Sequence, residues 1–112
     1  MKNIIYVGDS HKVISKFPNK PKQQILSLLD GIKFGVMPLP QEFKCIPTVG
    51  KGVYELRIRS GAQYRVFFVS KFHESIYILH AFTKKTQKTA RKDISIAKKR
   101  YKDVIKYRGK IQ

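Results

Sequence analysis

The stretch that indicates the fold most clearly is Val53-Tyr-Glu-Leu-Arg-Ile-Arg59, followed by Ser60-Gly-Ala62 and then by Gln63-Tyr-Arg-Val-Phe-Phe-Val-Ser-Lys71. In the first run, apolar side chains occupy the even positions, and charged side chains occupy the odd positions from residue 55 on. Alternation with a period of two is typical of a β-strand with one face in the core. Because a three-residue loop containing glycine separates the two runs, the sequence predicts an antiparallel hairpin.

The register of this hairpin follows from burial. If Arg59 lies opposite Gln63, every apolar residue on the even face of the first strand meets an apolar partner, and Arg57 lies opposite Arg65. A two-residue loop would instead place Arg59 opposite Tyr64 and bring charge into the core, at a high desolvation cost. The odd-length loop is therefore favoured, and we expect Arg57 and Arg65 to share an open sheet face.

Before the hairpin, the chain predicts one strand and two helices. Asn3 to Val7 has the β-branched character of a strand. A short helix is expected from Ser10 to Phe17, where Pro18 ends it. A longer helix is expected from its capping residue Asn19 to a stop at Gly35. Met37 to Pro47 contains three prolines and is expected to be a connecting loop.

After the hairpin, the chain predicts a central strand and a final helix. Ser75 to Thr83 carries apolar residues on both faces, as expected of a strand flanked on both sides. Thr89 is expected to cap the final helix. The apolar stripe of that helix consists of Ile94, Ala97, Tyr101, Val104 and Ile105. Together the elements predict one α+β domain over residues 1–112, with a small antiparallel-dominated sheet, two N-terminal helices and a C-terminal helix.

The charge balance indicates the class of partner. The chain has 112 residues, with 24 Lys and Arg against 7 Asp and Glu and a formal net charge of +17. Such an excess predicts an anionic partner, most simply nucleic acid. The longest apolar run, Ile76 to Phe82, is too short to cross a membrane, no secretion signal is evident, and the single Cys45 excludes an internal disulfide. We therefore expect a cytoplasmic protein that binds neither membrane nor metal.

The residues best suited to chemistry are cationic. Arg57 and Arg65 on neighbouring strands, with Lys84 and Lys85 at the end of the next strand, predict a phosphate site, because guanidinium groups grip phosphate in a bidentate fork. A lysine crowded by other cations has a lowered pKa and can exchange a proton near neutral pH. The same side chains would also suit a solvated surface, with the arginines on an exposed sheet face and the lysines as solubilising groups.

A family resemblance sharpens this interpretation. Gly52–Arg59, Tyr64–Val66 and Leu79–Thr89, followed by a helix with Ala97, resemble the HigB or phage Gp49 branch of the RelE/ParE toxin superfamily. The departure is Ala90, where related sequences often place a proline that opens the last helix. The resemblance implies a RelE-like fold, a small sheet carrying two N-terminal helices and a C-terminal helix. It also implies a toxin of a type II toxin–antitoxin pair that cleaves messenger RNA on the translating ribosome.

Carried over residue by residue, the resemblance makes Arg57 and Arg65 ligands of the phosphate and of the transition state, with Lys84 and Lys85 as base and charge stabilisers. Phe82 would stack a nucleobase. The other RNA-binding residues implied are Arg59, Thr86, Gln87 and Lys88. The implied reaction is attack of the ribose 2′-hydroxyl on the adjacent phosphate, without metal or cofactor. The implied partners are the message on the ribosome, with contacts to ribosomal RNA, and a HigA-like helix-turn-helix antitoxin.

Two other functions stay open at this point. Relatives of the ParE type share the scaffold and inhibit DNA gyrase by binding it, so the fold alone does not decide the function. A basic protein that binds RNA or DNA without catalysis would carry the same charge. Among the remaining residues, His80 lies within an apolar strand and is expected to be packed rather than to act as a base. Phe82 could equally be a core residue.

Overall fold

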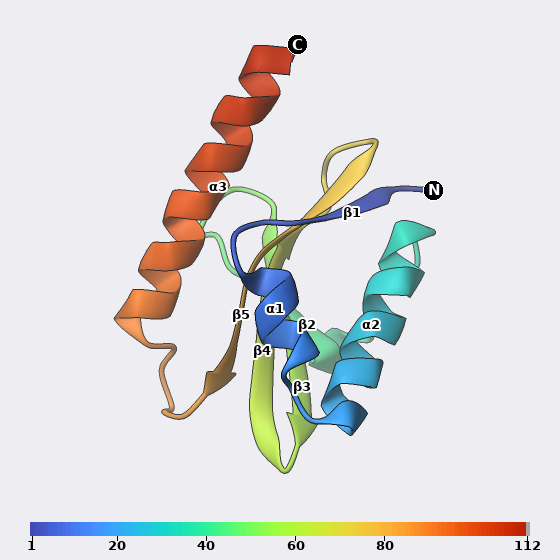
Figure 1. The fold of residues 1–112 in the computed structure, drawn as a ribbon, viewed down its shortest axis with the longest axis vertical. Helices are drawn as coiled ribbons and strands as arrows, with labels where there is room; N and C mark the ends of the chain where they lie inside the picture. The colour runs from blue at the N-terminus through green and yellow to red at the C-terminus, as the bar shows by residue number, and fades with distance from the viewer. Residues whose placement is uncertain (112) are drawn as a thin grey trace.

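The computed structural model describes residues 1–111. Within this range, five strands form one sheet and three α-helices flank it. In chain order the elements are β1 (Asn3–Tyr6), α1 (Ser10–Ser15), α2 (Asn19–Lys33), the 3₁₀ turn η1 (Pro40–Glu42), β2 (Phe43–Cys45), β3 (Val53–Ser60), β4 (Ala62–Val69), β5 (Ser75–Lys84) and α3 (Arg91–Ile111). Figure 1 shows α3 along one face of the sheet and α1 and α2 on the other. The predicted α+β class is confirmed.

The sheet is mixed rather than purely antiparallel. Its strand order is β1-β5-β4-β3-β2, with β1 parallel to β5 and the other neighbours antiparallel. Parallel neighbours need a long connection, and here the connection includes α1, α2 and the other three strands. The prediction of an antiparallel-dominated sheet is therefore only partly right. β5 lies between β1 and β4, as expected for a strand with apolar residues on both faces.

The β3–β4 hairpin has the predicted register. Arg59 pairs with Gln63, and Arg57 pairs with Arg65. At the tip, the last residue of β3 pairs with the first of β4. Gly61 between them has a φ of +79°, a backbone region that favours glycine. The odd-length connection keeps the apolar residues of both strands on one face.

Helix α2 turns its apolar stripe toward the face of the sheet that α1 also covers. Ile25 and Leu29 are fully buried and pack in one cluster with Leu56 of β3 and Phe68 of β4. Burying a side chain of this size contributes about 1.5–3 kcal/mol. Gly35 follows the helix with a φ of +85°, which is the conformation of a C-terminal stop. The predicted end of this helix is therefore confirmed.

Helix α3 covers the opposite face. Its residues Ala97 and Val104 pack in a second cluster with Phe67 and Leu79 of the sheet. Its predicted outer residues are exposed: Arg91, Lys92, Lys98, Lys99, Lys102 and Lys106. The central strands are thus buried on each side, one side by the α1 and α2 pair and the other by α3. Among residues 1–111, no helix combines the length and the apolar character needed to span a membrane.

A β-bulge decides which face the second half of β5 presents. One extra residue, Leu79, lies in β5 between the residues paired with Phe67 and Phe68. An extra residue shifts the alternation of side chains by one position. Beyond the bulge, the even-numbered residues of β5 therefore turn to the α3 face. Lys84, which pairs with Gln63, reaches that face for this reason.

Several boundaries differ from the prediction, among them the end of α1, which is Ser15 rather than Phe17. Met37 to Pro47, expected to be a loop, contains η1 and β2, because the open edge of β3 accepts a three-residue strand. Asn19 is the first residue of α2, and Pro18 occupies the capping position. Helix α3 begins at Arg91, so Thr89 lies one residue too early to be its cap.

The apolar stripe of α3 also ends earlier than predicted. Ile105 is 41% exposed, whereas Arg108 is buried against the sheet. The Arg108 guanidinium donates hydrogen bonds to Glu74 and, at 3.2 Å, to the Tyr77 hydroxyl, and it lies 3.9 Å from the centre of the Phe72 ring. A cation packed on an aromatic ring is a stabilising contact. It replaces the aliphatic contact expected from Ile105.

Candidate functional site

The cationic residues predicted from the sequence gather at one end of the sheet. The tip of the β3–β4 hairpin, the end of β5 and the chain leading to α3 lie at this end (Figure 1). They border a cleft of about 370 Å³. Its lining residues are Arg57, Arg59, Gln63, Arg65, Lys84, Lys85, Thr86 and Gln87. The four predicted catalytic residues therefore line one cleft, together with three of the predicted RNA-binding residues.

A buried carboxylate lies between the two central arginines. Glu55 is 3% exposed, and its Oε1 lies 3.3 Å from Arg57 Nε and 3.8 Å from Arg65 Nε. Within the described part of the chain, neither Nε donates a hydrogen bond, so these contacts are ionic. Glu55 offsets part of the repulsion between two guanidinium groups that the register places opposite each other.

Arg65 is buried, and the prediction of an open face is wrong for it. It is 2% exposed because β4 is an inner strand with β3 and β5 at its sides. Its Nη2 donates to Gln63 Oε1 at 2.6 Å and its Nη1 to the Tyr64 carbonyl at 3.2 Å. Burial lowers the pKa of its guanidinium, the nearby Glu55 opposes this, and repulsion from Arg57 adds to it. Arg65 is thus a fixed charge at the wall of the cleft.

On β3 and β5, the accessible cations of the cleft are Arg57, Arg59 and Lys84. The Arg57 side chain is 35% exposed, Arg59 is exposed and Lys84 is half-buried. Burial lowers the pKa of the Lys84 amine, repulsion from Arg65 and Arg57 lowers it further, and Glu55 opposes both effects. This direction agrees with the prediction of a lysine crowded by cations. Lys84 can therefore lose its proton more readily than a lysine on an open surface.

The segment after β5 supplies the remaining lining. Lys85, Thr86 and Gln87 are exposed and border the cleft. The Thr86 hydroxyl donates a hydrogen bond to the Lys88 carbonyl, which folds the segment back on itself. Lys88 is exposed as well but does not line this cleft. Any contact that it makes with RNA would lie outside the cleft.

The Phe82 ring is less exposed than a ring on which a nucleobase stacks freely. It is 7% exposed, and its ring stacks on His80 with centroids 5.4 Å apart and meets Phe67 edge-on at 5.2 Å. It lines a second cleft of about 360 Å³, which also borders Lys84. Only a small part of the ring is open to a ligand, and the stacking of a nucleobase on it stays a prediction.

Comparison with known proteins identifies the family. The sequence matches the family described as phage-derived protein Gp49-like over residues 12–102, which is most of the chain. The chain belongs to the Gp49-like family. This family lies in the RelE/ParE-like toxin group, as the resemblance in sequence indicated. The matched range includes every residue of the cleft. Among curated proteins, none matches the sequence significantly.

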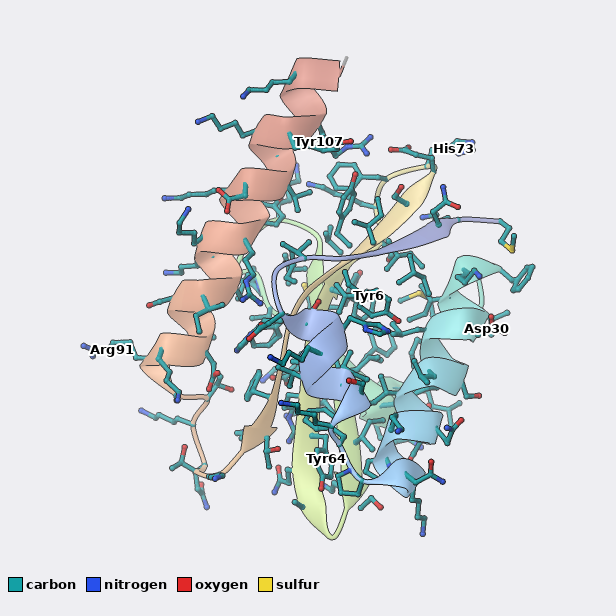
Figure 2. All side chains as sticks on the ribbon, viewed as in Figure 1. Tyr6, Asp30, Tyr64, His73, Arg91 and Tyr107 are labelled. Carbon is teal, nitrogen blue, oxygen red and sulfur yellow. The ribbon has the colours of Figure 1, made fainter. Side chains whose placement is uncertain are left out.

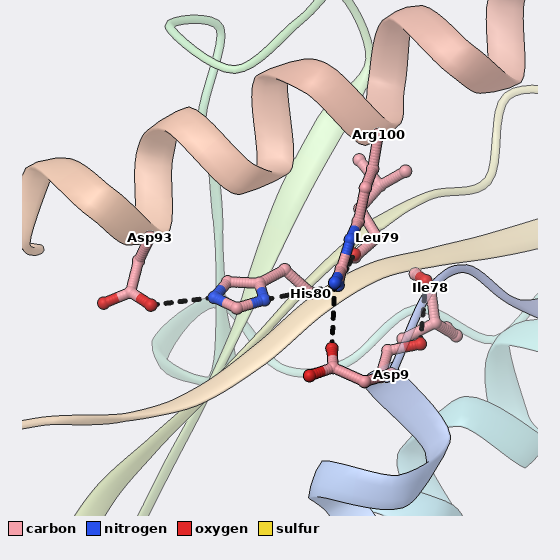
Figure 3. Close-up of polar contacts among 7 residues, drawn as sticks. Asp9, Ile78, Leu79, His80, Asp93 and Arg100 are labelled. Atoms are coloured by element: carbon pink, nitrogen blue, oxygen red, sulfur yellow. Dashed lines mark hydrogen bonds and ion pairs between the residues drawn. The ribbon is translucent and has the colours of Figure 1, made fainter.

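Beside the cleft, the Gp49-like chain holds a polar network. His80 is buried, and its Nε2 lies 2.8 Å from Asp93 Oδ1 (Figure 3). On the other side of the ring, Arg100 Nη1 lies 3.5 Å from His80 Nδ1 and donates to the Leu79 carbonyl at 3.0 Å. Its Nη2 donates to Asp9 at 2.9 Å, which lowers the pKa of the Asp9 carboxyl. His80 is packed as expected, and the network joins the N-terminal cap of α1, β5 and α3.

Glu55 and Asp93 are carboxylates near the Gp49-like cleft that sequence reasoning did not assign to the site. A signal existed for Glu55, since it shares the odd face of its strand with Arg57. None existed for Asp93, because an acidic residue in the first turn of a helix is common. Within residues 1–111, no group of three or more His, Cys, Asp or Glu side chains could hold a metal ion.

Proposed function

We propose that this Gp49-like protein is the toxin of a type II toxin–antitoxin pair and that it cleaves messenger RNA on the translating ribosome. The observation that carries the proposal is the cleft lined jointly by Arg57, Arg65, Lys84 and Lys85. Membership of a family in the RelE/ParE-like toxin group supports the role of a toxin. The net charge of +17 suits an RNA partner, because cations that neutralise phosphates release counterions.

The reaction is an internal attack within the RNA. The ribose 2′-oxygen forms a bond to the adjacent phosphorus while the bond from phosphorus to the 5′-oxygen breaks, which leaves a 2′,3′-cyclic phosphate. The Lys84 amine, whose pKa is lowered by burial and neighbouring cations, takes the proton from the 2′-hydroxyl. The Lys85 ammonium returns a proton to the departing 5′-oxygen, so the protons balance.

The arginines have different roles in this proposal. Arg57 is exposed enough to place two donors on the non-bridging oxygens as charge develops there. Arg65 is too buried to grip the phosphate from an open face. Its fixed charge instead raises the positive potential of the cleft and contributes to the lowered pKa of Lys84. The ion pair with Glu55 holds the Arg57 guanidinium in place.

Two groups of residues bind RNA on the ribosome, one in the cleft and one on α3. Arg59 and Gln87 extend the lining of the cleft, and Lys98, Lys99, Lys102 and Lys106 surround a shallow depression on α3. Such a lysine surface suits ribosomal RNA, and its affinity for RNA falls as the salt concentration rises. A HigA-like helix-turn-helix antitoxin, implied by the family resemblance, neutralises the toxin in the cytoplasm, where messages are translated.

Induced expression with transcript mapping tests the proposal. The wild-type protein is expected to arrest growth and to cut messages at codons that ribosomes occupy. Arg57→Ala is expected to slow cleavage about 10²- to 10³-fold, the effect of losing one preorganised donor. The matched control is Arg91→Ala, because Arg91 extends away from the sheet at the start of α3 (Figure 2). The control variant is expected to cleave like the wild type.

Three results would contradict the proposal. Intact messages during growth arrest, with DNA trapped on gyrase, would indicate an inhibitor of the ParE type. Messages cut equally well by Arg57→Ala would place the chemistry outside the cleft. Intact messages in cells that keep growing would indicate a basic nucleic-acid-binding protein without catalysis.

A further inference from the structure

A second cleft adjoins the phosphate cleft. It measures about 360 Å³ and shares Lys84, Lys85 and Thr86 with the first cleft. Its other lining residues are Phe82, Thr83, Ala90, Lys92 and Asp93. Because the two clefts share a wall, a nucleotide whose phosphate lies beside Lys84 has a second compartment within reach. The lining combines an aromatic ring, hydrogen-bonding groups and one carboxylate.

The Asp93 carboxylate is fixed in place by His80. Arg100 has only donors, so His80 Nδ1 accepts and Nε2 carries the hydrogen that it donates to Asp93 Oδ1 at 2.8 Å. The His80 ring is in turn held by stacking on Phe82. Asp93 is 7% exposed, and Figure 3 shows its second oxygen directed away from the ring. Within residues 1–111, the side-chain hydrogen bond of Asp93 involves Oδ1, which leaves Oδ2 to the second cleft.

A carboxylate held in this way selects its ligand by hydrogen bonding. The free oxygen only accepts hydrogen bonds, so it needs a donor on the facing edge of the ligand. Adenine, cytosine and guanine carry an exocyclic amino group, and carboxylates accept from such groups in base recognition. Uracil has no amino group, and its single N–H lies between two carbonyl oxygens that a carboxylate repels.

The other residues of the second cleft suit a flat heteroaromatic ring. The open part of Phe82 provides apolar contact for such a ring. Lys85 and Lys92 are exposed at the wall of the cleft, and their ammonium groups can donate to the ring nitrogens and carbonyl oxygens of a base. We propose that this cleft binds the nucleobase next to the scissile phosphate and that Asp93 selects a base with an amino group. The inference rests on the proposed RNA cleavage.

A randomised message in a cell-free translation system tests the inference. The bases at each position around every cut are counted for the wild type, for Asp93→Asn and for Asp103→Asn. We expect the wild type to favour amino-bearing bases over uracil about fivefold or more at one position beside the cut. Asp93→Asn keeps an oxygen for His80 but turns an amide N–H₂ toward the cleft, so the preference over uracil should disappear.

Asp103→Asn is the matched control for this experiment. Asp103 lies on the same helix, is exposed and contacts Lys99, so the same chemical change there should leave base preference unchanged. Thermal unfolding shows whether each variant is folded. Should Asp93→Asn unfold, Asp93→Glu keeps the charge but displaces the carboxylate, and it should weaken the preference.

The outcomes separate the inference from the function on which it rests. A wild type that cuts no message overturns the proposed cleavage and the inference with it. A wild type that cuts messages, with a folded Asp93→Asn or Asp93→Glu that keeps the same base preference, overturns the inference alone. A changed rate with unchanged preference would likewise show that Asp93 supports the fold and does not contact the base.

Discussion

The two faces of the sheet are built differently. The face under α1 and α2 is held by apolar packing, with Ile25, Leu56 and Phe68 fully buried. The face toward α3 is apolar along the helix, but near the hairpin tip it buries Glu55 and Arg65. Burying charge is costly even when the charges are paired. The difference indicates that the first face stabilises the fold, whereas part of the second face forms the cationic cleft.

The largest expected effect is on the apolar face. Phe68→Ala should lower the free energy of unfolding by about 3–5 kcal/mol, because it removes a buried ring and leaves a cavity. Urea unfolding followed by circular dichroism measures this loss. The rate of message cleavage per folded molecule should stay the same, since Phe68 does not line the cleft. A loss of that rate would show that the two faces are not separate in function.

The next effect concerns the buried charges. Glu55→Gln should lower the free energy of unfolding by about 3 kcal/mol, because Arg65 loses its buried counter-charge. Adding Arg65→Met should recover most of that stability, since an apolar side chain replaces an unpaired charge. The double variant should still cleave messages more slowly than the wild type. A single Glu55→Gln variant as stable as the wild type would show that the ion pair contributes nothing to the fold.

The smallest effect concerns proton transfer. Because the pKa of Lys84 is lowered, the fraction of neutral amine rises with pH and reaches its maximum at lower pH than for an ordinary lysine. Below that pKa, the cleavage rate should rise about tenfold per pH unit, or about 1.4 kcal/mol. Lys84→Arg keeps the positive charge without titrating in this range, so its residual rate should not follow pH. A wild-type rate independent of pH would exclude Lys84 as the base.

The register of the hairpin, and with it the pairing of the two central arginines, could be predicted from the sequence. Burial of the even face of β3 allows one register, and that register places Arg57 opposite Arg65. Lys84 and Lys85 lie at the end of the last strand, so the sequence predicts a position next to the arginine pair for them. The register needed only the alternation of side chains and the length of one loop, whereas the face that Lys84 reaches depends on the bulge in β5.

Features that depend on the whole sheet could not be predicted. Without the extra residue Leu79, alternation would turn Lys84 to the face of α1 and α2, and the sequence has no mark of this bulge. The burial of Arg65 follows from β5 pairing on the far side of β4. The parallel pairing of β1 and the contact of Asp93 with His80 join segments distant in the chain.

The proposed reaction is attack of the 2′-hydroxyl on the neighbouring phosphate, driven by the cationic cleft. Its most direct test is the chemistry of the cut ends, measured by mass spectrometry of message fragments from a cell-free translation reaction. We expect upstream fragments ending in a 2′,3′-cyclic phosphate and downstream fragments beginning with a free 5′-hydroxyl, with far fewer of both in Lys84→Ala. Upstream fragments with a 3′-hydroxyl and downstream fragments with a 5′-phosphate would contradict it.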